Sequence, residues 1–252
     1  MWYGKRSYRR VEMSRTLASL LASLFLLSSS TLAGAYDLSD RYLTHHFIDN
    51  IRQSTIPLQI RRKYQDVDDQ EQEEGVQGTG TVLCDNETGK RYILTTEHLF
   101  PANKKLSFYV RTRGMRIEKI TRTSKKDLAL LETDDTTHPC LKGKVGTDYH
   151  VGDFVLYIGY PKGESPFLRE SRLMSYLDDE HILHEAHYSP GDSGGGVFGS
   201  EFGEPRLIGI SQLFLYKDCQ EKPWAVAING KLICEFLQGT AVHDEYCGGE
   251  KK

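Results

Sequence analysis

Two features are missing from this sequence: a strong excess of one charge and a long apolar run. Its 252 residues hold 32 Lys and Arg against 35 Asp and Glu, which gives a formal net charge of −3. Proteins that bind nucleic acid usually carry a clear basic excess, so we expect no nucleic-acid partner. The one marked apolar run, residues 17–27, has about half of the roughly 20 residues that a membrane-spanning helix needs. The composition is that of an ordinary globular protein.

This apolar run belongs to an N-terminus with the pattern of an export signal. Five Lys and Arg precede it within residues 5–15, and residues 33–35 (Ala-Gly-Ala) fit a small-x-small cleavage site. We expect a cut after Ala35, which makes residues 1–35 a signal peptide and leaves no membrane segment in the mature chain. Met13 is an alternative start, and an uncleaved anchor is the competing interpretation. The protein is thus expected to be exported to the periplasm or the medium.

The sequence also lacks the closely spaced Cys and His pairs of zinc sites. We therefore expect no metal, and nothing in the sequence asks for another cofactor. In an exported chain five cysteines allow two disulfides and one free thiol, in fifteen connectivities (five choices of the free thiol, each with three pairings). At least one pair is expected among the three late cysteines, and the sequence does not choose it. The five are Cys84, Cys140, Cys219, Cys234 and Cys247.

Short strand-like segments separated by turn residues fill the chain after residue 55. Gly is frequent, and Tyr, Val, Ile and Thr recur in runs, which favours β structure. In the first half the expected strands are residues 56–64, 76–84, 91–96, 106–111, 115–121 and 128–132. In the second half they are residues 154–159, 168–176, 181–187, 195–198, 206–213 and 224–228. Two sets of about six strands favour an all-β fold of two small barrels over one large sheet.

Helices and loops are expected around these strands. Residues 39–53 and 229–237 carry apolar side chains at helical spacing. The acidic run 65–74 is expected to be a solvated loop or flexible insertion, with a propeptide linker processed near residues 61–63 as the alternative. The expected divisions are an N-terminal helical extension (36–55), a first barrel (56–145), a second barrel with the C-terminal helix (146–238) and a tail (239–252).

One segment concentrates residues that a barrel does not need. Residues 189–196 read Ser-Pro-Gly-Asp-Ser-Gly-Gly-Gly, with four glycines, an Asp and a Ser in six consecutive positions. Glycines let a backbone adopt positive φ and approach a ligand closely. Ser193, held between them, can expose its hydroxyl while its own N–H and a neighbouring N–H point to one spot. That arrangement is a nucleophile beside an oxyanion hole. A polar turn between two strands is the alternative.

A serine nucleophile needs a base and an acid, and the strand ends offer one of each. His98 follows an apolar strand that ends in Thr-Thr-Glu, where a scaffold can present a base. The alternative is a surface loop histidine, which is the default for any single His. Asp127 directly precedes the run Leu-Ala-Leu-Leu, where a half-buried carboxylate can orient an imidazole, with a plain turn Asp as its alternative. Asp134 and Asp135 are poorer candidates because they lie in a polar run.

The order of His98, Asp127 and Ser193, with the contexts TTEH, DLALL and GDSGGG, resembles the chymotrypsin-fold (trypsin-like, S1-type) serine proteases. The likeness is greatest to bacterial HtrA/Deg-like and glutamyl-endopeptidase-like members, over about residues 56–238. It implies two six-stranded antiparallel Greek-key barrels and peptide-bond hydrolysis through an acyl-enzyme. It also implies roles: Ser193 is the nucleophile, His98 the base and Asp127 its orienting acid, and the N–H groups of Gly191 and Ser193 form the oxyanion hole.

The sequence departs from the family pattern near Asp192. In trypsins the matching Asp pairs with a freshly cut N-terminus, and the activation sequence Arg-Ile-Val-Gly-Gly is missing here. We therefore expect Asp192 to pair with an internal cation or with backbone donors, without activation by cleavage. A turn-capping Asp is the alternative. Two further departures are Glu97, which stands where a small residue is common, and Gly196, which stands where many relatives have Pro.

Substrate preference rests on few residues. The resemblance places His187 near the floor of the primary pocket, and Ser211, Gln212 and Leu213 along its wall. A His floor and a Leu wall favour a small, apolar or acidic side chain over Lys or Arg. His181 and His184 belong to the same expected strand as His187 (residues 181–187), and both are expected at the surface.

Other function classes are the alternatives. A catalytically silent relative would serve as a binding or scaffold module, but all three triad positions and the serine-loop glycines are present. An esterase with the same triad is disfavoured because a GxSxG elbow followed directly by a helix is missing. The two barrels leave little room for a PDZ-like domain, so we expect a monomer whose partners are protein or peptide substrates.

Overall fold

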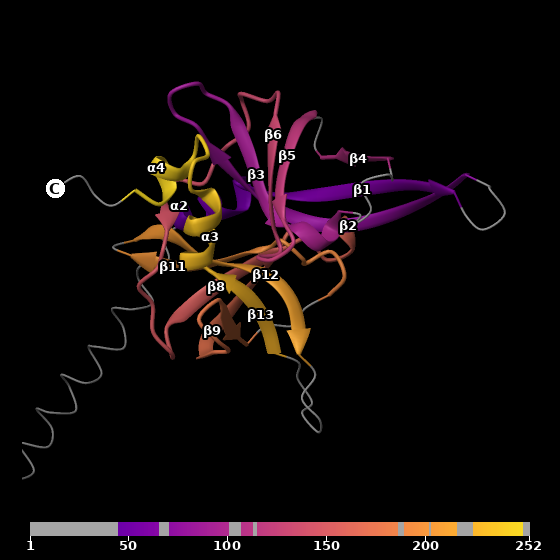
Figure 1. Cartoon of the computed structure of the whole chain (residues 1–252). Helices are drawn as coiled ribbons and strands as arrows, with labels where there is room; N and C mark the ends of the chain where they lie inside the picture. The colour runs from indigo at the N-terminus through magenta and orange to yellow at the C-terminus, as the bar shows by residue number, and fades with distance from the viewer. Residues whose placement is uncertain are drawn as a thin grey trace, which may run out of the picture. The chain divides into compact units, whose positions relative to one another are not determined.

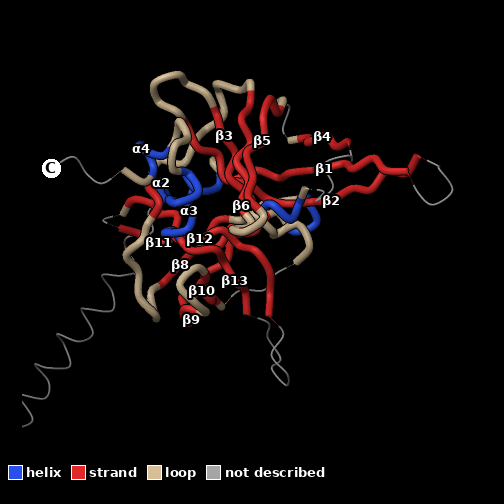
Figure 2. The backbone as a smooth tube through the Cα atoms, viewed as in Figure 1, coloured by secondary structure: helices blue, strands red, loops and turns tan. Residues whose placement is uncertain are grey.

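The structure is a computed structural model that describes residues 45–65, 71–100, 107–112, 115–185, 189–201, 203–215 and 224–248. The predicted signal peptide (1–35), His187 and Cys219 lie outside the described residues. Within these ranges, no helix has the length and apolar character needed to cross a membrane. Strands make up most of the described chain, and its α-helices lie at one side (Figure 2).

The first sheet has six antiparallel strands in the order β4-β1-β2-β3-β6-β5. They are β1 (Thr55–Gln65), β2 (Glu71–Cys84), β3 (Arg91–Thr96), β4 (Ser107–Arg111), β5 (Ile117–Thr123) and β6 (Leu128–Thr133). An isolated antiparallel bridge between Thr112 and Met115 lies in the connection from β4 to β5, the two outer strands of this barrel-like sheet. Because successive side chains of a strand point to opposite faces, alternate apolar residues fill the interior. Ile56, Leu58, Ile60 and Ile93 are fully buried there.

The second sheet closes on itself. Its strands are β8 (Phe154–Gly159), β9 (Phe167–Tyr176), β10 (His181–His184), β11 (Gly196–Glu201), β12 (Glu204–Leu215) and β13 (Trp224–Asn229). They follow the order β11-β8-β9-β10-β13-β12, and β12 pairs again with β11. A short strand, β7 (Lys144–Val145), adds to β12 in parallel, outside the strands that we expected. The architecture confirms the predicted all-β fold of two barrels.

A shared apolar core joins the two barrels. Leu94 and Leu130 of the first barrel belong to the same buried cluster as Leu156, Phe198 and Ile228 of the second. Burying such a side chain stabilises a protein by roughly 1.5–3 kcal/mol. The two barrels therefore stabilise each other, and loops at their junction are held from both sides.

Short helices and two disulfides complete the described chain. The predicted helices are confirmed as α2 (His45–Gln53) and α3 (Gly230–Leu237). The additional helix α4 (His243–Tyr246) lies in the expected tail, where four residues are too few to show helical periodicity. Disulfides join Cys84 to Cys140 and Cys234 to Cys247, and the second is a pair of the kind expected among the late cysteines.

The acidic run is not wholly a loop. We expected a loop over residues 65–74, whereas β2 begins at Glu71 and pairs with β1 in one unbroken register. The register brings Arg61 Nη1 to 2.8 Å from Glu73 Oε1, a cross-strand contact that sequence periodicity does not reveal. The resulting β1–β2 hairpin reaches beyond the rest of its sheet (Figure 1).

Candidate active site

His98 and Asp127 are positioned by the ends of two neighbouring strands. The chain leaves β3 in a 3-10 turn, η2 (Glu97–Leu99), which presents His98. Asp127 directly precedes β6 with a positive φ of 49°, a conformation that Asp tolerates better than most residues. Glu97 N–H donates to the Asp127 carbonyl at 3.1 Å, and His98 N–H donates to Asp127 Oδ1 at 2.7 Å. The backbone of the turn thereby fixes the Asp127 carboxylate.

The three predicted triad residues form one connected chain of hydrogen bonds. Asp127 Oδ2 lies 2.8 Å from His98 Nδ1, and His98 Nε2 lies 2.9 Å from Ser193 Oγ. An ionised carboxylate only accepts, so it favours the tautomer with a proton on Nδ1 and leaves Nε2 to accept from the Ser193 hydroxyl. The Asp127 side chain is 14% exposed and the His98 side chain 42%, so the carboxylate is shielded while the imidazole is open to solvent.

Glycines shape the loop that carries Ser193. Gly191 and Gly194 have φ values of 100° and 85°, which glycine adopts without steric strain. A Cβ on Gly194 would lie 2.0 Å from the Thr79 carbonyl oxygen. Thr79 N–H donates to the Ser193 carbonyl at 2.8 Å, and Gly194 N–H donates to the Ser211 carbonyl at 2.8 Å. Ser193 is thus held between β2 of the first barrel and β12 of the second.

Contacts on Pro190 and Gly191 set the direction of the peptide between them. Lys162 N–H donates to the Pro190 carbonyl at 2.8 Å. The C=O and N–H of a trans peptide point in opposite directions, so Gly191 N–H points away from Lys162. Thr79 Oγ1 donates to the Gly191 carbonyl at 2.8 Å and accepts from Tyr160 N–H at 2.8 Å. These contacts are compatible with the predicted oxyanion hole.

Asp192 is fully buried in this loop and has internal partners of the kind that we expected. Its Oδ2 accepts from Ser189 N–H at 2.8 Å and lies 3.6 Å from Arg169 Nη1. Burial raises the pKa of Asp192, while the Ser189 N–H and the Arg169 charge act in the opposite direction. The Tyr157 hydroxyl donates to the Asp192 carbonyl at 3.1 Å. The partner of Asp192 is therefore an internal arginine, whereas in the trypsin pattern the partner is a freshly cut N-terminus.

Sequence reasoning did not identify Arg169. It lies on β9 in alternation with the buried Ser171 and Leu173, and its side chain is only 14% exposed. The guanidinium carbon lies 4.4 Å from the centre of the Phe167 ring. A basic residue at an inward position of a barrel strand is the signal that reveals such a site, because a buried cation needs a buried acid.

The unusual Glu97 tethers the turn that presents His98. Its Oε1 lies 3.7 Å from Arg122 Nη1 on β5, and both side chains are mostly buried, at 15% and 21% exposure. The pair connects η2 to the β5–β6 hairpin, whose connecting turn carries Asp127. Glu97 therefore helps to hold His98 and Asp127 in a fixed position relative to each other.

One residue that we expected at the surface is buried. His184 is 0% exposed and lies beside Tyr157, with ring centres 5.7 Å apart. Burial and the nearby Arg169 charge lower its pKa to about 4, so its imidazole is neutral near pH 7. The expectation was wrong because β10 shifts register against β9 at this residue, and such a bulge breaks the alternation of inward and outward side chains. His181 is half-buried, with Nδ1 2.9 Å from Asp178 Oδ1.

The residues predicted for the primary pocket are only partly described. Ser211 is fully buried and Leu213 is 41% exposed, on either side of a register shift between β12 and β13. His187 lies outside the described residues. The pocket assignment therefore stays a prediction.

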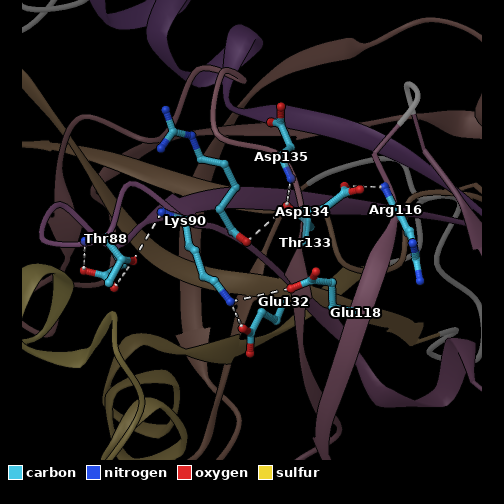
Figure 3. A network of polar contacts seen from close by, with 10 residues as sticks. Thr88, Lys90, Arg116, Glu118, Glu132, Thr133, Asp134 and Asp135 are labelled. Atoms are coloured by element: carbon cyan, nitrogen blue, oxygen red, sulfur yellow. Dashed lines mark hydrogen bonds and ion pairs between the residues drawn. The ribbon is translucent and has the colours of Figure 1, made fainter.

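The two weaker acid candidates bind main-chain groups away from His98: Asp134 binds the strand segment before β5, and Asp135 caps the turn that follows it. Asp134 Oδ1 accepts from Arg116 N–H at 2.9 Å, and Asp135 Oδ2 accepts from His138 N–H at 2.8 Å. Figure 3 shows both aspartates near a polar network in which Lys90 bridges two glutamates. Of the three aspartates considered, Asp127 alone contacts His98.

Comparison with known proteins gives the class of this chain. Residues 78–210, more than half of the chain, match the family described as trypsin-like peptidase domain. The chain belongs to the trypsin-like peptidase family, which confirms the resemblance predicted from the triad motifs. No curated protein sequence matches the chain.

Solved structures share the fold at low sequence identity. A serine endoprotease from Yersinia pestis is 18% identical, with a TM-score of 0.55 over 79% of this chain and 66% of the other. The Rv3671c protease from M. tuberculosis, in its active form, is 16% identical, with a TM-score of 0.55 over 76% and 82%. The HtrA-type protease AlgW, a variant with a decapeptide, is 18% identical, with a TM-score of 0.63 over 80% and 67%. The present chain thus spans about two thirds of the length of the Yersinia and AlgW chains.

Proposed function

We propose that this chain is an exported serine endopeptidase that hydrolyses peptide bonds through an acyl-enzyme. The observation that carries the proposal is the unbroken series of hydrogen bonds from Asp127 through His98 to Ser193. Such a series activates a hydroxyl that is a weak nucleophile on its own. Membership of the trypsin-like peptidase family supports the same reaction class.

In the first step Ser193 Oγ attacks the carbonyl carbon of the scissile peptide bond. His98 Nε2 takes the hydroxyl proton as the Oγ–C bond forms, and it passes that proton to the leaving nitrogen as the C–N bond breaks. Asp127 holds the Nδ1–H tautomer and stabilises the imidazolium. The products are an amine and an ester of Ser193, which water hydrolyses by the same route with His98 as the base.

The N–H groups of Gly191 and Ser193 stabilise the negative oxygen that develops during each attack. Loss of one such donor typically costs roughly 2.7–4 kcal/mol of transition-state stabilisation. Thr79 supports this role because it binds the carbonyl groups of both residues, through its side chain and its main chain. A donor that is already oriented needs no rearrangement when the charge appears.

The Arg169–Asp192 contact supports a protease that needs no activating cleavage. In this chain the partner of the buried aspartate is a side chain of the folded barrel. Folding alone therefore supplies the charge that stabilises the serine loop.

Export is supported by the N-terminal pattern and by two disulfides, which persist in oxidising compartments. Mass spectrometry of the secreted protein is expected to find Tyr36 at the N-terminus. Recovery of an active protein that retains residues 1–35 would contradict the proposed cleavage.

The nucleophile is tested with the Ser193→Ala variant. We expect loss of casein cleavage and of fluorophosphonate labelling, with an unchanged urea unfolding midpoint, because the change removes only the hydroxyl. Asp127→Asn is expected to lower kcat by about 10⁴-fold, and Asp134→Asn is the matched control that leaves it unchanged. If folded wild-type protein does not label at Ser193, the chain is a silent binding module instead.

A further inference from the structure

Phe167 is the first residue of β9, and it is 50% exposed. Because successive side chains of a strand point to opposite faces, Phe167 belongs to the same series as Arg169, Ser171 and Leu173 on the inward face of β9. Arg169 is mostly buried, and Ser171 and Leu173 are buried. Phe167 is therefore the outermost member of this inward series, and exposure falls along the series toward the interior of the barrel.

The Phe167 ring covers the guanidinium of Arg169. The guanidinium carbon lies 4.4 Å from the centre of the Phe167 ring and 5.9 Å from the centre of the Tyr157 ring. At both distances a cation is attracted to the face of an aromatic ring. The closer ring leaves no space for a water molecule between itself and the guanidinium. Tyr157 is fully buried, so Phe167 is the ring that separates this cation from solvent.

Few polar contacts fix the position of this guanidinium. Within the described residues, Arg169 Nη1 makes no hydrogen bond, and it lies 3.6 Å from Asp192 Oδ2. An arginine side chain has many rotamers, and an ion pair without a hydrogen bond does not select one of them. The contacts that restrict the guanidinium to its place beside Asp192 are therefore those of the two aromatic rings.

The strand opposite Phe167 leaves room for this arrangement. Gly159 of β8 is the cross-strand partner of Phe167, and Figure 1 shows β8 and β9 side by side. A Cβ on Gly159 would collide with Asp192 Oδ1 and with the Tyr157 hydroxyl. The missing side chain therefore admits the Asp192 carboxylate. The aromatic ring on the neighbouring strand provides the apolar cover that a glycine cannot provide.

Asp192 connects the position of the guanidinium to the serine loop. It lies between Gly191 and Ser193, whose N–H groups are the proposed oxyanion donors. A guanidinium that moves away leaves a buried carboxylate without its counter-charge, and the loop then rearranges to solvate it. We propose that Phe167 is a positioning residue for the active site: its ring shields the Arg169–Asp192 pair from water and keeps the guanidinium beside the carboxylate. This inference rests on the proposed function.

Substitutions of Phe167 separate the effect of the ring from that of its bulk. We expect Phe167→Ala to lower the rate constant of fluorophosphonate labelling about tenfold, the size of one shielded cation–π contact. Phe167→Leu restores bulk without the ring and stays slow, whereas Phe167→Tyr recovers the wild-type rate. On a peptide substrate the loss is expected in kcat and not in KM, because the serine loop acts in the transition state. Met174→Ala, at an exposed position of the same strand, is the control.

Salt tests whether the ring keeps water and ions away from the pair. At about 1 M salt the Debye length is about 3 Å, shorter than the 3.6 Å between Arg169 Nη1 and Asp192 Oδ2. Raising sodium chloride from about 0.1 M to about 1 M is therefore expected to slow labelling of Phe167→Ala about threefold. Wild-type protein and Phe167→Tyr should not respond, because a shielded pair is screened little. Met174→Ala corrects for any effect of salt on the labelling reaction itself.

A second background shows whether Phe167 acts through the guanidinium. The Arg169→Met/Asp192→Asn protein has neither charge, so the ring has no cation to hold. We expect Phe167→Ala to slow labelling about tenfold in the wild-type background and less than about twofold in this one. An equal loss in both backgrounds would show that the ring acts by packing alone and would overturn the inference. Full activity of Phe167→Ala, or no recovery in Phe167→Tyr, would do the same.

Nuclear magnetic resonance tests the contact without catalysis. In isotope-labelled Ser193→Ala protein, the Arg169 Nε–H signal is identified by its loss in Arg169→Met. We expect this signal upfield of its ordinary position, because an aromatic ring shields protons above its face. Phe167→Tyr should keep the shift and Phe167→Leu should remove it, and an equal shift in both would overturn the inference. A protein with this shift whose wild-type form never labels at Ser193 would contradict the proposed function and leave the contact of Phe167 with Arg169 in place.

Discussion

Arg169, Asp192 and His184 bring three ionisable groups into the interior of the second barrel. Within the described residues, Asp192 Oδ1, Arg169 Nη1 and His184 Nε2 make no hydrogen bond, and the closest approach of the ion pair is 3.6 Å. A buried ion pair of this kind adds little net stability, because desolvation of the charges offsets their attraction. Its value lies in the serine loop that Asp192 anchors.

Removal of the cation leaves an uncompensated buried charge. Arg169→Met is expected to lower the free energy of unfolding by about 3–5 kcal/mol and to slow fluorophosphonate labelling. Arg172→Met, at an exposed position of the same strand, is the control. Urea unfolding measures both. The double variant Arg169→Met/Asp192→Asn is expected to recover part of the loss, and a double variant no more stable than Arg169→Met would contradict the pairing.

His184 makes stability depend on pH. Its pKa is lowered from the ordinary 6.5 to about 4, so the unfolded chain takes up a proton at a higher pH than the folded one. The stability linked to His184 is therefore full above about pH 6.5 and is lost as the pH falls toward 4. The raised pKa of Asp192 acts with the opposite sign.

Comparison with a variant isolates the histidine. Between pH 7 and pH 5, wild-type protein is expected to lose about 2 kcal/mol more stability than His184→Phe. Phe keeps an aromatic ring beside Tyr157, and Asp192 is common to both proteins. Urea unfolding at the two pH values measures the difference. Parallel losses in the two proteins would show that His184 is not the titrating group.

At the scale of elements, the C-terminal segment that runs from α3 to the end of α4, here called the clasp, binds the first barrel. The Tyr246 hydroxyl of α4 donates to the Leu141 carbonyl at 3.1 Å and accepts from Cys84 N–H at 3.0 Å. Burial raises the pKa of Tyr246 to about 12, which keeps this hydroxyl protonated and able to donate. The Cys234–Cys247 disulfide joins α3 to the end of α4.

The disulfide is expected to hold this clasp closed. Its cysteines are 13 residues apart, and a crosslink closing a loop of that size contributes about 3 kcal/mol. Cys234→Ser/Cys247→Ser should lose that amount in urea unfolding and show faster hydrogen exchange in α4, with Ser193 labelling retained. Cys219→Ser is the control, since neither disulfide uses Cys219. Unchanged exchange in α4 would disprove the clasp.

Local patterns predicted most elements, and non-local contacts account for those that were missed. β3 and β8 have the predicted bounds because apolar runs between turn residues identify buried strands. The triad was predictable because each member lies beside a recognisable strand or glycine loop. Arg169 was not, because no local motif marks its pairing with Asp192. The start of β2 was also missed, because it is defined by pairing with β1, and that register alone brings Arg61 beside Glu73.

At the scale of the whole molecule, the site exists only where the barrels meet. The first barrel supplies His98 and Asp127, and the second supplies Ser193. The buried Tyr160 hydroxyl adds a bond across the junction, to the Thr55 carbonyl at 3.1 Å. Because of these contacts and the shared apolar core, we expect neither barrel to be stable without the other.

The barrels are therefore expected to unfold together. Near-ultraviolet circular dichroism and residual fluorophosphonate labelling should fall at the same urea concentration, in one transition. A protein whose labelling disappears well before its tertiary signal would have barrels that separate while still folded.

The contacts of Thr79 mean that the active site assembles only after most of the chain has been synthesised. It binds Ser193, Gly191 and Tyr160, which are all synthesised long after Thr79 itself. A partly synthesised chain has His98 and Asp127 but not Ser193, and a chain with undocked barrels has all three residues without their alignment. The order of the sequence thus places the formation of the proposed active site after synthesis and folding are complete.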